Sequence, residues 1–140
     1  MSSFRTYNTA ARAPARPMQH VIDPGGWTVD MLKDIESWTY RFTEGERDEL
    51  IAATKALKAQ GVAPEDVTRE NFRLGALAGT LADVLKELRG GRGMIMLRGF
   101  PVESLDRLGQ VIGYLGLGCH LGLPMSQNML EQEEFVQTAM

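Results

Sequence analysis

The residues best suited to chemistry lie near the end of the chain, between Gly118 and Gly122. Cys119 and His120 stand side by side there, and the sequence contains one other histidine, His20, and no other cysteine. A metal site needs three or four ligands, which this pair does not supply. A cysteine nucleophile needs a base that a third group orients, and the sequence identifies none. We therefore expect no catalytic and no metal-binding residue in this chain, and Cys119 to be a small buried hydrophobe.

His120 has a further interpretation, because glycines on both sides of it suggest close backbone packing beside a polar ring. A polar cluster follows Pro124 and comprises Ser126, Gln127 and Asn128. This cluster is either a surface turn or the wall of a pocket. The carboxylates of Glu131, Glu133 and Glu134 are typical of a solvated chain end.

The whole chain sets bounds on the protein that carries these residues. Its 140 residues are about one domain in length, and its net charge of -3 does not favour nucleic acid as a partner. No apolar run reaches the roughly 20 residues that cross a bilayer, so we expect no membrane partner. A lone cysteine is typical of a reducing compartment, which favours the cytoplasm.

The first 22 residues differ from the rest because they contain three arginines and no acidic residue. Such a leader is either a solvated, disordered tail or an organelle-targeting peptide, which would make the protein mitochondrial. We divide the chain into a disordered leader (1–22), a folded segment (23–128) and a C-terminal tail (129–140).

Periodic apolar residues predict several helices. Met31, Ile35, Trp38 and Phe42 share one helical face after Thr28. Thr43 and Glu46 have the spacing of a capping box, followed by an inner stripe and a stop at Gly61. That stripe consists of Leu50, Ala53, Thr54 and Leu57. The clearest pattern predicts a helix over 74–88, formed by Leu74, Leu77, Ala78, Leu81, Leu85 and Leu88. A last helix, capped by Ser104, has Leu105, Leu108, Ile112 and Leu115 facing inward.

Met94 to Leu97 lie between glycines and a proline without alternation, which predicts a strand buried on both faces. Beyond that strand, Gly116, Gly118 and Gly122 are expected to break the chain into loop or irregular strand. Few other segments can pair with the strand from Met94 to Leu97. The candidates are Cys119 to Leu123 and Phe135 to Thr138. The expected fold class is α+β, mostly helical with one or two strands.

The stretch from Glu87 to Asn128 resembles the N-terminal part of the taurine dioxygenase-like (TauD/TfdA) family. The matching pieces are Gly91-Arg92-Gly93, Met94 to Pro101, the helix Leu105 to Leu115, Gly118 to Gly122, and Gln127-Asn128. The resemblance extends from about Gly26 to Asn128. It implies an oxidoreductase, an Fe(II)- and 2-oxoglutarate-dependent dioxygenase with a double-stranded β-helix, or jelly roll, of which this chain would hold an incomplete part.

The family's iron ligands are a His-x-Asp pair and a distant histidine, and an arginine further along binds 2-oxoglutarate. Neither His20 nor His120 is followed by an acid at the second position. All these family positions would lie beyond Asn128. The resemblance therefore implies a truncated N-terminal portion that is inactive alone. We expect this chain to bind neither Fe(II) nor 2-oxoglutarate, although the full-length enzymes of the family use both.

Within that family the segment around His120, Gln127 and Asn128 would line the pocket of a small-molecule substrate. Arg92 and Arg98 would be strand-end residues that face solvent or acidic partners. An alternative function is a non-catalytic helical module that binds or regulates a full-length relative. The exposed strand also predicts self-association, because an unpaired strand edge is a template for pairing.

Overall fold

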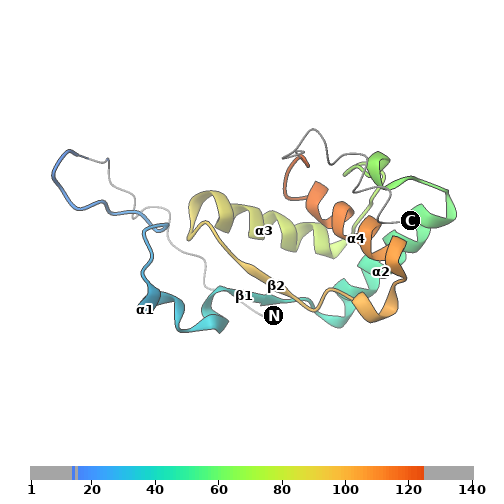
Figure 1. Cartoon of the computed structure of the whole chain (residues 1–140), viewed down its shortest axis with the longest axis horizontal. Helices are drawn as coiled ribbons and strands as arrows, with labels where there is room; N and C mark the ends of the chain where they lie inside the picture. The colour runs from blue at the N-terminus through green and yellow to red at the C-terminus, as the bar shows by residue number, and fades with distance from the viewer. Residues whose placement is uncertain (1–13, 15, 125–140) are drawn as a thin grey trace. The chain divides into compact units, whose positions relative to one another are not determined.

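The computed structural model describes residue 14 and residues 16–124 (Figure 1). Helices and two short strands alternate along this part of the chain. In order they are α1 (Val29–Leu32), the 3-10 turn η2 (Ile35–Trp38), β1 (Thr39–Arg41), α2 (Glu44–Ala59), η3 (Pro64–Asp66), α3 (Ala76–Gly90), β2 (Met96–Arg98), η4 (Val102–Ser104) and α4 (Arg107–Cys119). The chain divides into two compact units, the first made of residues 1–42 and 82–99, the second of 43–81 and 100–140. Helix α3 begins in the second unit and ends in the first.

The first unit contains a two-stranded parallel sheet, in which Tyr40 of β1 pairs with Leu97 of β2. The Phe42 N–H extends the ladder by donating to the Arg98 carbonyl at 2.9 Å. Tyr40 and Phe42 are both buried, and their rings pack edge to face with centroids 5.9 Å apart. Gly99 ends the strand with a φ of +91°, a conformation that favours glycine.

The predicted helix through Phe42 is wrong. Residues 29–32 and 35–38 form only single turns, and β1 follows them. Met31 and Ile35 are exposed, so the apolar residues of the pattern do not share a buried face. The run Thr39 to Phe42 is β-branched or aromatic at three of its four positions, a composition that favours extended backbone.

The strand near Met94 exists but is shorter than predicted and only half-buried. Its backbone pairs at Met96–Arg98, and the prediction that Met94 to Leu97 are buried on both faces is wrong. Arg98 is exposed as expected, whereas Arg92 is 3% exposed, so of its two expected settings, solvent or acidic partners, solvent is wrong. The backbone N–H of Arg92 donates to the carboxylate of Glu87, which is also buried.

The second unit contains α2 and α4, which lie beside each other (Figure 1). In α2 the predicted stripe is confirmed at Leu50, Thr54 and Leu57, and Gly61 follows the helix with a φ of +70°. Helix α3 is confirmed within two residues of its predicted ends, with Leu77 and Leu81 fully buried.

Helix α4 is confirmed with two corrections. Asp106 caps it instead of Ser104, and the helix continues through Gly116 and Gly118. The expected break at Gly116 and Gly118 is therefore wrong, whereas residues 120–124 are turn and loop, as one of the two alternatives had it, and form no strand. The other candidate strand, Phe135 to Thr138, lies outside the described residues.

The observed class is α+β, mostly helical with a two-stranded parallel sheet. Within residues 14 and 16–124, no helix has the length and apolar character needed to span a membrane.

Candidate functional site

The candidate site is built on the helices of the second unit, and α2 begins it with a complete capping box. The Thr43 hydroxyl accepts from the Glu46 N–H at 3.3 Å, and the Glu46 carboxylate accepts from the Thr43 N–H at 2.9 Å. The other Glu46 oxygen accepts from the Thr80 hydroxyl at 2.5 Å, which joins α2 to α3. A buried carboxylate is therefore hydrogen-bonded on both oxygens, which offsets its loss of water.

Glu49, one turn further along α2, caps the start of α3. Its carboxylate accepts from the backbone N–H groups of Gly75, Ala76 and Leu77 at 2.8, 3.0 and 3.2 Å. These are donors that the first turn of a helix leaves unpaired, and a negative charge is also favoured at the positive end of the helix dipole. One side chain thus fixes where α3 begins.

Helix α4 begins at Asp106, whose carboxylate accepts from the Gly109 N–H at 2.9 Å and from the Lys58 ammonium at 2.6 Å. The hydrogen bond from Lys58 lowers the pKa of Asp106, and the Gly109 N–H adds to this effect. The same carboxylate therefore caps α4 and links it to α2.

Small residues let α4 pack closely against its neighbours. A Cβ added at Gly113 would lie 2.8 Å from the Thr54 hydroxyl oxygen, and one added at Gly116 would overlap the ring of Phe72. Phe72 is fully buried in the connection between α2 and α3. Among the described residues, Gly118 and Gly122 have no atom near an added Cβ, so the close packing expected beside His120 is wrong at those two positions.

His120 ends α4 and is 8% exposed. Its Nε2 lies 2.9 Å from the Phe72 carbonyl oxygen, so Nε2 carries a hydrogen and donates. This bond ties the end of α4 to the connection that contains Phe72.

Cys119 is half-buried, and its thiol donates to the Val67 carbonyl at 3.4 Å. Burial raises the pKa of the Cys119 thiol, and the charge of Glu70 raises it further. A raised pKa disfavours the nucleophilic thiolate, whereas the expectation that Cys119 is buried is met only in part.

The described residues do not fit an iron site. His20 is exposed and belongs to the first unit, and the Nε2 of His120 in the second is already a donor to Phe72. Within residues 14 and 16–124, no three histidine, cysteine, aspartate or glutamate side chains converge in a way that could hold a metal ion. Gln127 and Asn128, the other candidate substrate-binding residues, lie outside the described part of the chain.

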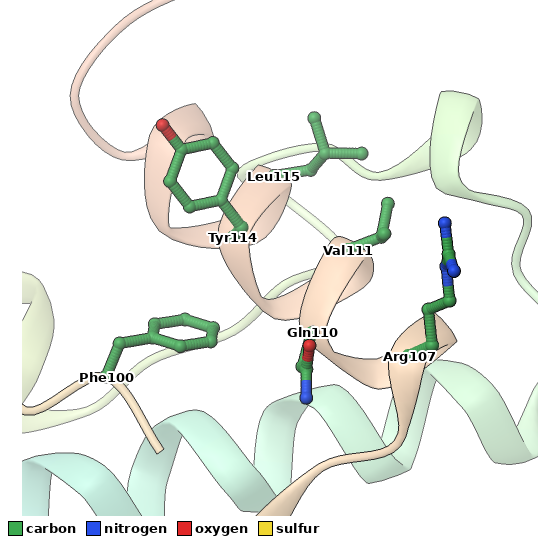
Figure 2. A pocket seen from close by; sticks show the side chains of 6 residues that line it. All are labelled: Phe100, Arg107, Gln110, Val111, Tyr114 and Leu115. Carbon is green, nitrogen blue, oxygen red and sulfur yellow. The ribbon is translucent and has the colours of Figure 1, made fainter. Parts of the chain in front are cut away.

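The second unit also carries an apolar hollow on its surface (Figure 2). The side chains of α4 that line it follow one another along the helix, and Phe100 lies at its side. Tyr114 is 69% exposed there. The lining consists of Phe100, Arg107, Gln110, Val111, Tyr114 and Leu115.

Comparison with known proteins finds an enzyme relative. The chain is 31% identical over 102 residues to FR-33289 synthase from Streptomyces rubellomurinus (strain ATCC 31215). The match covers 73% of this chain but only 30% of the synthase, so the chain corresponds to less than a third of that relative's length. No protein-family model matches the chain.

Sequence reasoning missed the hollow and the cap from Glu49. The hollow had a signal in the sequence, because Val111 and Leu115 are four residues apart and Tyr114 lies beside them on the outer face of α4. Glu49 had none, since its three partners are 26 to 28 residues away.

Proposed function

We propose that this chain is the N-terminal segment of an Fe(II)- and 2-oxoglutarate-dependent dioxygenase that resembles the taurine dioxygenase family. The observation that carries the proposal is the 102-residue relationship to FR-33289 synthase, which suggests an oxygenase-like relative. The run of motifs from Gly91 to Asn128 supports the same family. An enzyme of that family would complete a jelly roll with residues that this chain does not contain.

In this proposal the segment has no chemistry of its own. Its histidines do not form a ligand set with a carboxylate in the described part of the chain, and burial raises the pKa of the Cys119 thiol, which disfavours the thiolate. Iron and 2-oxoglutarate would belong to the full-length enzyme. The role of this segment is to supply a packed helical unit against which such an enzyme is built.

Substrate contact in a full-length enzyme is proposed for His120, Gln127 and Asn128. The buried position of His120 supports a fixed ring, because its Nε2 is committed to the Phe72 carbonyl. A substrate would meet the remaining part of the imidazole. In a full-length enzyme, His120→Ala should raise the substrate KM and leave iron binding intact.

A chimera tests whether the segment is equivalent to the front of the synthase. The 102 residues of this chain that align with FR-33289 synthase would replace the matched region of the synthase, and synthase activity would be measured. We expect activity above that of a synthase from which the matched region is deleted. A chimera that is folded by circular dichroism yet no more active than the deletion would contradict the proposal.

The second candidate is a non-catalytic module that binds or regulates a full-length relative. It is favoured by exposed apolar side chains on the segment before β1, which include Val29 at 77% and Ile35 at 46% exposure. The strand edges of a two-stranded sheet also offer backbone groups for pairing, with another protein or with a second copy. Sedimentation of the chain with and without the intact synthase distinguishes binding to a relative from self-association. A clean monomer in both samples would contradict this candidate.

A further inference from the structure

A turn in the connection between α2 and α3 is organised by the side chain of Asn71. Its carbonyl oxygen accepts from the Thr68 N–H at 2.8 Å, and the Asn71 N–H donates to the Thr68 hydroxyl at 3.3 Å. The Asn71 side-chain amide also donates to the Asp66 carbonyl at 2.8 Å. Thr68 and Asn71 thus form a reciprocal pair, the Thr68–Asn71 box, that fixes the course of the turn.

The residues on either side of the box accept hydrogen bonds from the end of α4. Phe72 donates its N–H to the Thr68 carbonyl at 2.9 Å, which fixes the position of its own carbonyl relative to the box. That carbonyl accepts from Nε2 of His120 at 2.9 Å, and the Val67 carbonyl accepts from the Cys119 thiol at 3.4 Å. Two consecutive side chains are therefore held by the two residues that flank the box.

The contact with Phe72 decides which nitrogen of the His120 ring carries the hydrogen. A neutral imidazole has one donor and one acceptor, and a carbonyl can only accept. Nε2 therefore donates, and Nδ1 remains as an acceptor. Within residues 14 and 16–124 the structure gives this ring no second hydrogen bond. The orientation and the tautomer of the ring thus both depend on where the Phe72 carbonyl lies.

We propose that Asn71 is a positioning residue for His120. Asn71 acts through the Phe72 carbonyl and holds the imidazole so that Nδ1 accepts a hydrogen bond from a hydroxyl or amide N–H of the substrate. The His120 ring is 8% exposed, so turning away from the carbonyl would leave Nε2 without a partner and with little access to water, which is costly. The substrate part of this inference rests on the proposed function, whereas the positioning of the ring does not.

Nitrogen-15 NMR of the histidine rings in the full chain tests the positioning role, at a pH where the rings are neutral. Asn71→Ala opens the box, and Thr68→Val removes the hydroxyl that accepts from Asn71 while keeping the shape of the side chain. In both variants the ratio of the Nε2–H to the Nδ1–H tautomer of His120 should fall about two- to tenfold, the factor that corresponds to loss of one hydrogen bond. Thr68→Ser keeps the hydroxyl and should retain the wild-type ratio.

Two comparisons separate positioning from a general loss of stability. The ring signals report where the hydrogen lies in the folded chain, so lower stability alone does not move them. Arg69→Ala, at an exposed position in the same turn, is the matched control and should leave the ratio unchanged. An unchanged ratio in both Asn71→Ala and Thr68→Val would overturn the proposal. An equal fall in Arg69→Ala would overturn it too.

The proposed function adds a kinetic expectation that can fail separately. In a full-length enzyme that contains this segment, Asn71→Ala should raise the substrate KM more than it lowers kcat, and Arg69→Ala should change neither. A KM that stays unchanged although the tautomer ratio falls would contradict substrate contact by His120 and support the positioning of its ring. The NMR result decides the positioning role whether or not such an enzyme is active.

Discussion

The two units of the chain differ in how completely they bury their apolar residues. In the second unit, Leu50 and Ile112 are 0% exposed, and α2, α3 and α4 have caps or buried links to one another. In the first, α1 and η2 bury no residue, and the sheet has only two strands. Two-stranded sheets are marginal without further packing. The second unit thus closes its own core, whereas the segment before β1 in the first unit leaves Val29 and Ile35 exposed.

The largest expected effect is at the centre of the second unit. Phe72→Ala should lower the free energy of unfolding by about 3–5 kcal/mol, because it empties a fully buried site. The measurement is chemical denaturation followed by far-ultraviolet circular dichroism. Leu123→Ala is the control, because Leu123 is 88% exposed and its removal should change stability by less than about 0.5 kcal/mol. Equal effects for the two variants would mean that the second unit has no packed core.

Two glycine substitutions in α4 also test the packing of the second unit, because they should change the free energy of unfolding in opposite directions. Gly116→Ala should cost about 1–3 kcal/mol, because the new methyl group overlaps Phe72. Gly118→Ala meets open space among the described residues and should stabilise the helix by up to about 1 kcal/mol. Both are measured by the shift in denaturation midpoint. Stabilisation by Gly116→Ala would refute the close contact between α4 and Phe72.

The cap on α3 predicts a smaller loss. Glu49→Ala removes the acceptor for three backbone N–H groups and should cost about 0.5–2 kcal/mol, the range measured for loss of a helix cap. Asp48→Ala, on an exposed neighbouring position of the same helix, is the matched control. Hydrogen exchange should quicken at Gly75 to Leu77 only in the Glu49 variant. Unchanged exchange at these amides would contradict the capping role.

The ion pair between Asp106 and Lys58 predicts a pH dependence. The folded pKa of Asp106 lies below its unfolded value of about 3.9, so its contribution is complete above that pH and is lost as the pH falls through the folded pKa. Asp106→Asn retains an N-cap side chain and removes the charge. The free energy of unfolding should therefore fall less steeply below about pH 4 in this variant than in the wild type. Parallel curves would show that the pair does not contribute.

The smallest effect on stability is expected in the first unit. This prediction tests whether the apolar residues before β1 lie outside a packed core. Val29→Ser should change the free energy of unfolding by less than about 0.5 kcal/mol, because Val29 is exposed. If this face binds a partner, the same substitution should reduce self-association in sedimentation velocity at micromolar concentration. Asp30→Asn, an exposed neighbour, serves as the control. A large loss of stability would place Val29 in a core.

The sequence predicted the second unit better than the first for a physical reason. A capping box such as that of Thr43 and Glu46 is local, and the stripe around Leu50 repeats over several turns, so few residues decide each feature. The segment before Phe42 also has helical spacing, yet pairing of β1 with β2 joins residues 57 positions apart. Contacts that distant override local periodicity and leave little trace in either segment alone.

The candidate site was predicted only in part. Cys119 is half-buried, so its expected role as a small buried hydrophobe is met only in part. The hydrogen bond of His120 to the Phe72 carbonyl joins residues 48 positions apart, and no local pattern in the sequence predicts it. Close packing was predicted at Gly118 and Gly122, which flank His120, but it occurs at Gly113 and Gly116. Which glycine is crowded depends on the face of α4 that meets a neighbour, and the sequence shows only that all of them are small.

The most direct test of the central claim is an anaerobic Fe(II) titration of residues 1–140, followed by a succinate assay with 2-oxoglutarate and oxygen. If the chain is an N-terminal segment without chemistry of its own, no stoichiometric iron binding and no succinate above the protein-free control are expected. Succinate formation that requires Fe(II) and disappears with His120→Ala would contradict the account and establish this chain as an enzyme in its own right.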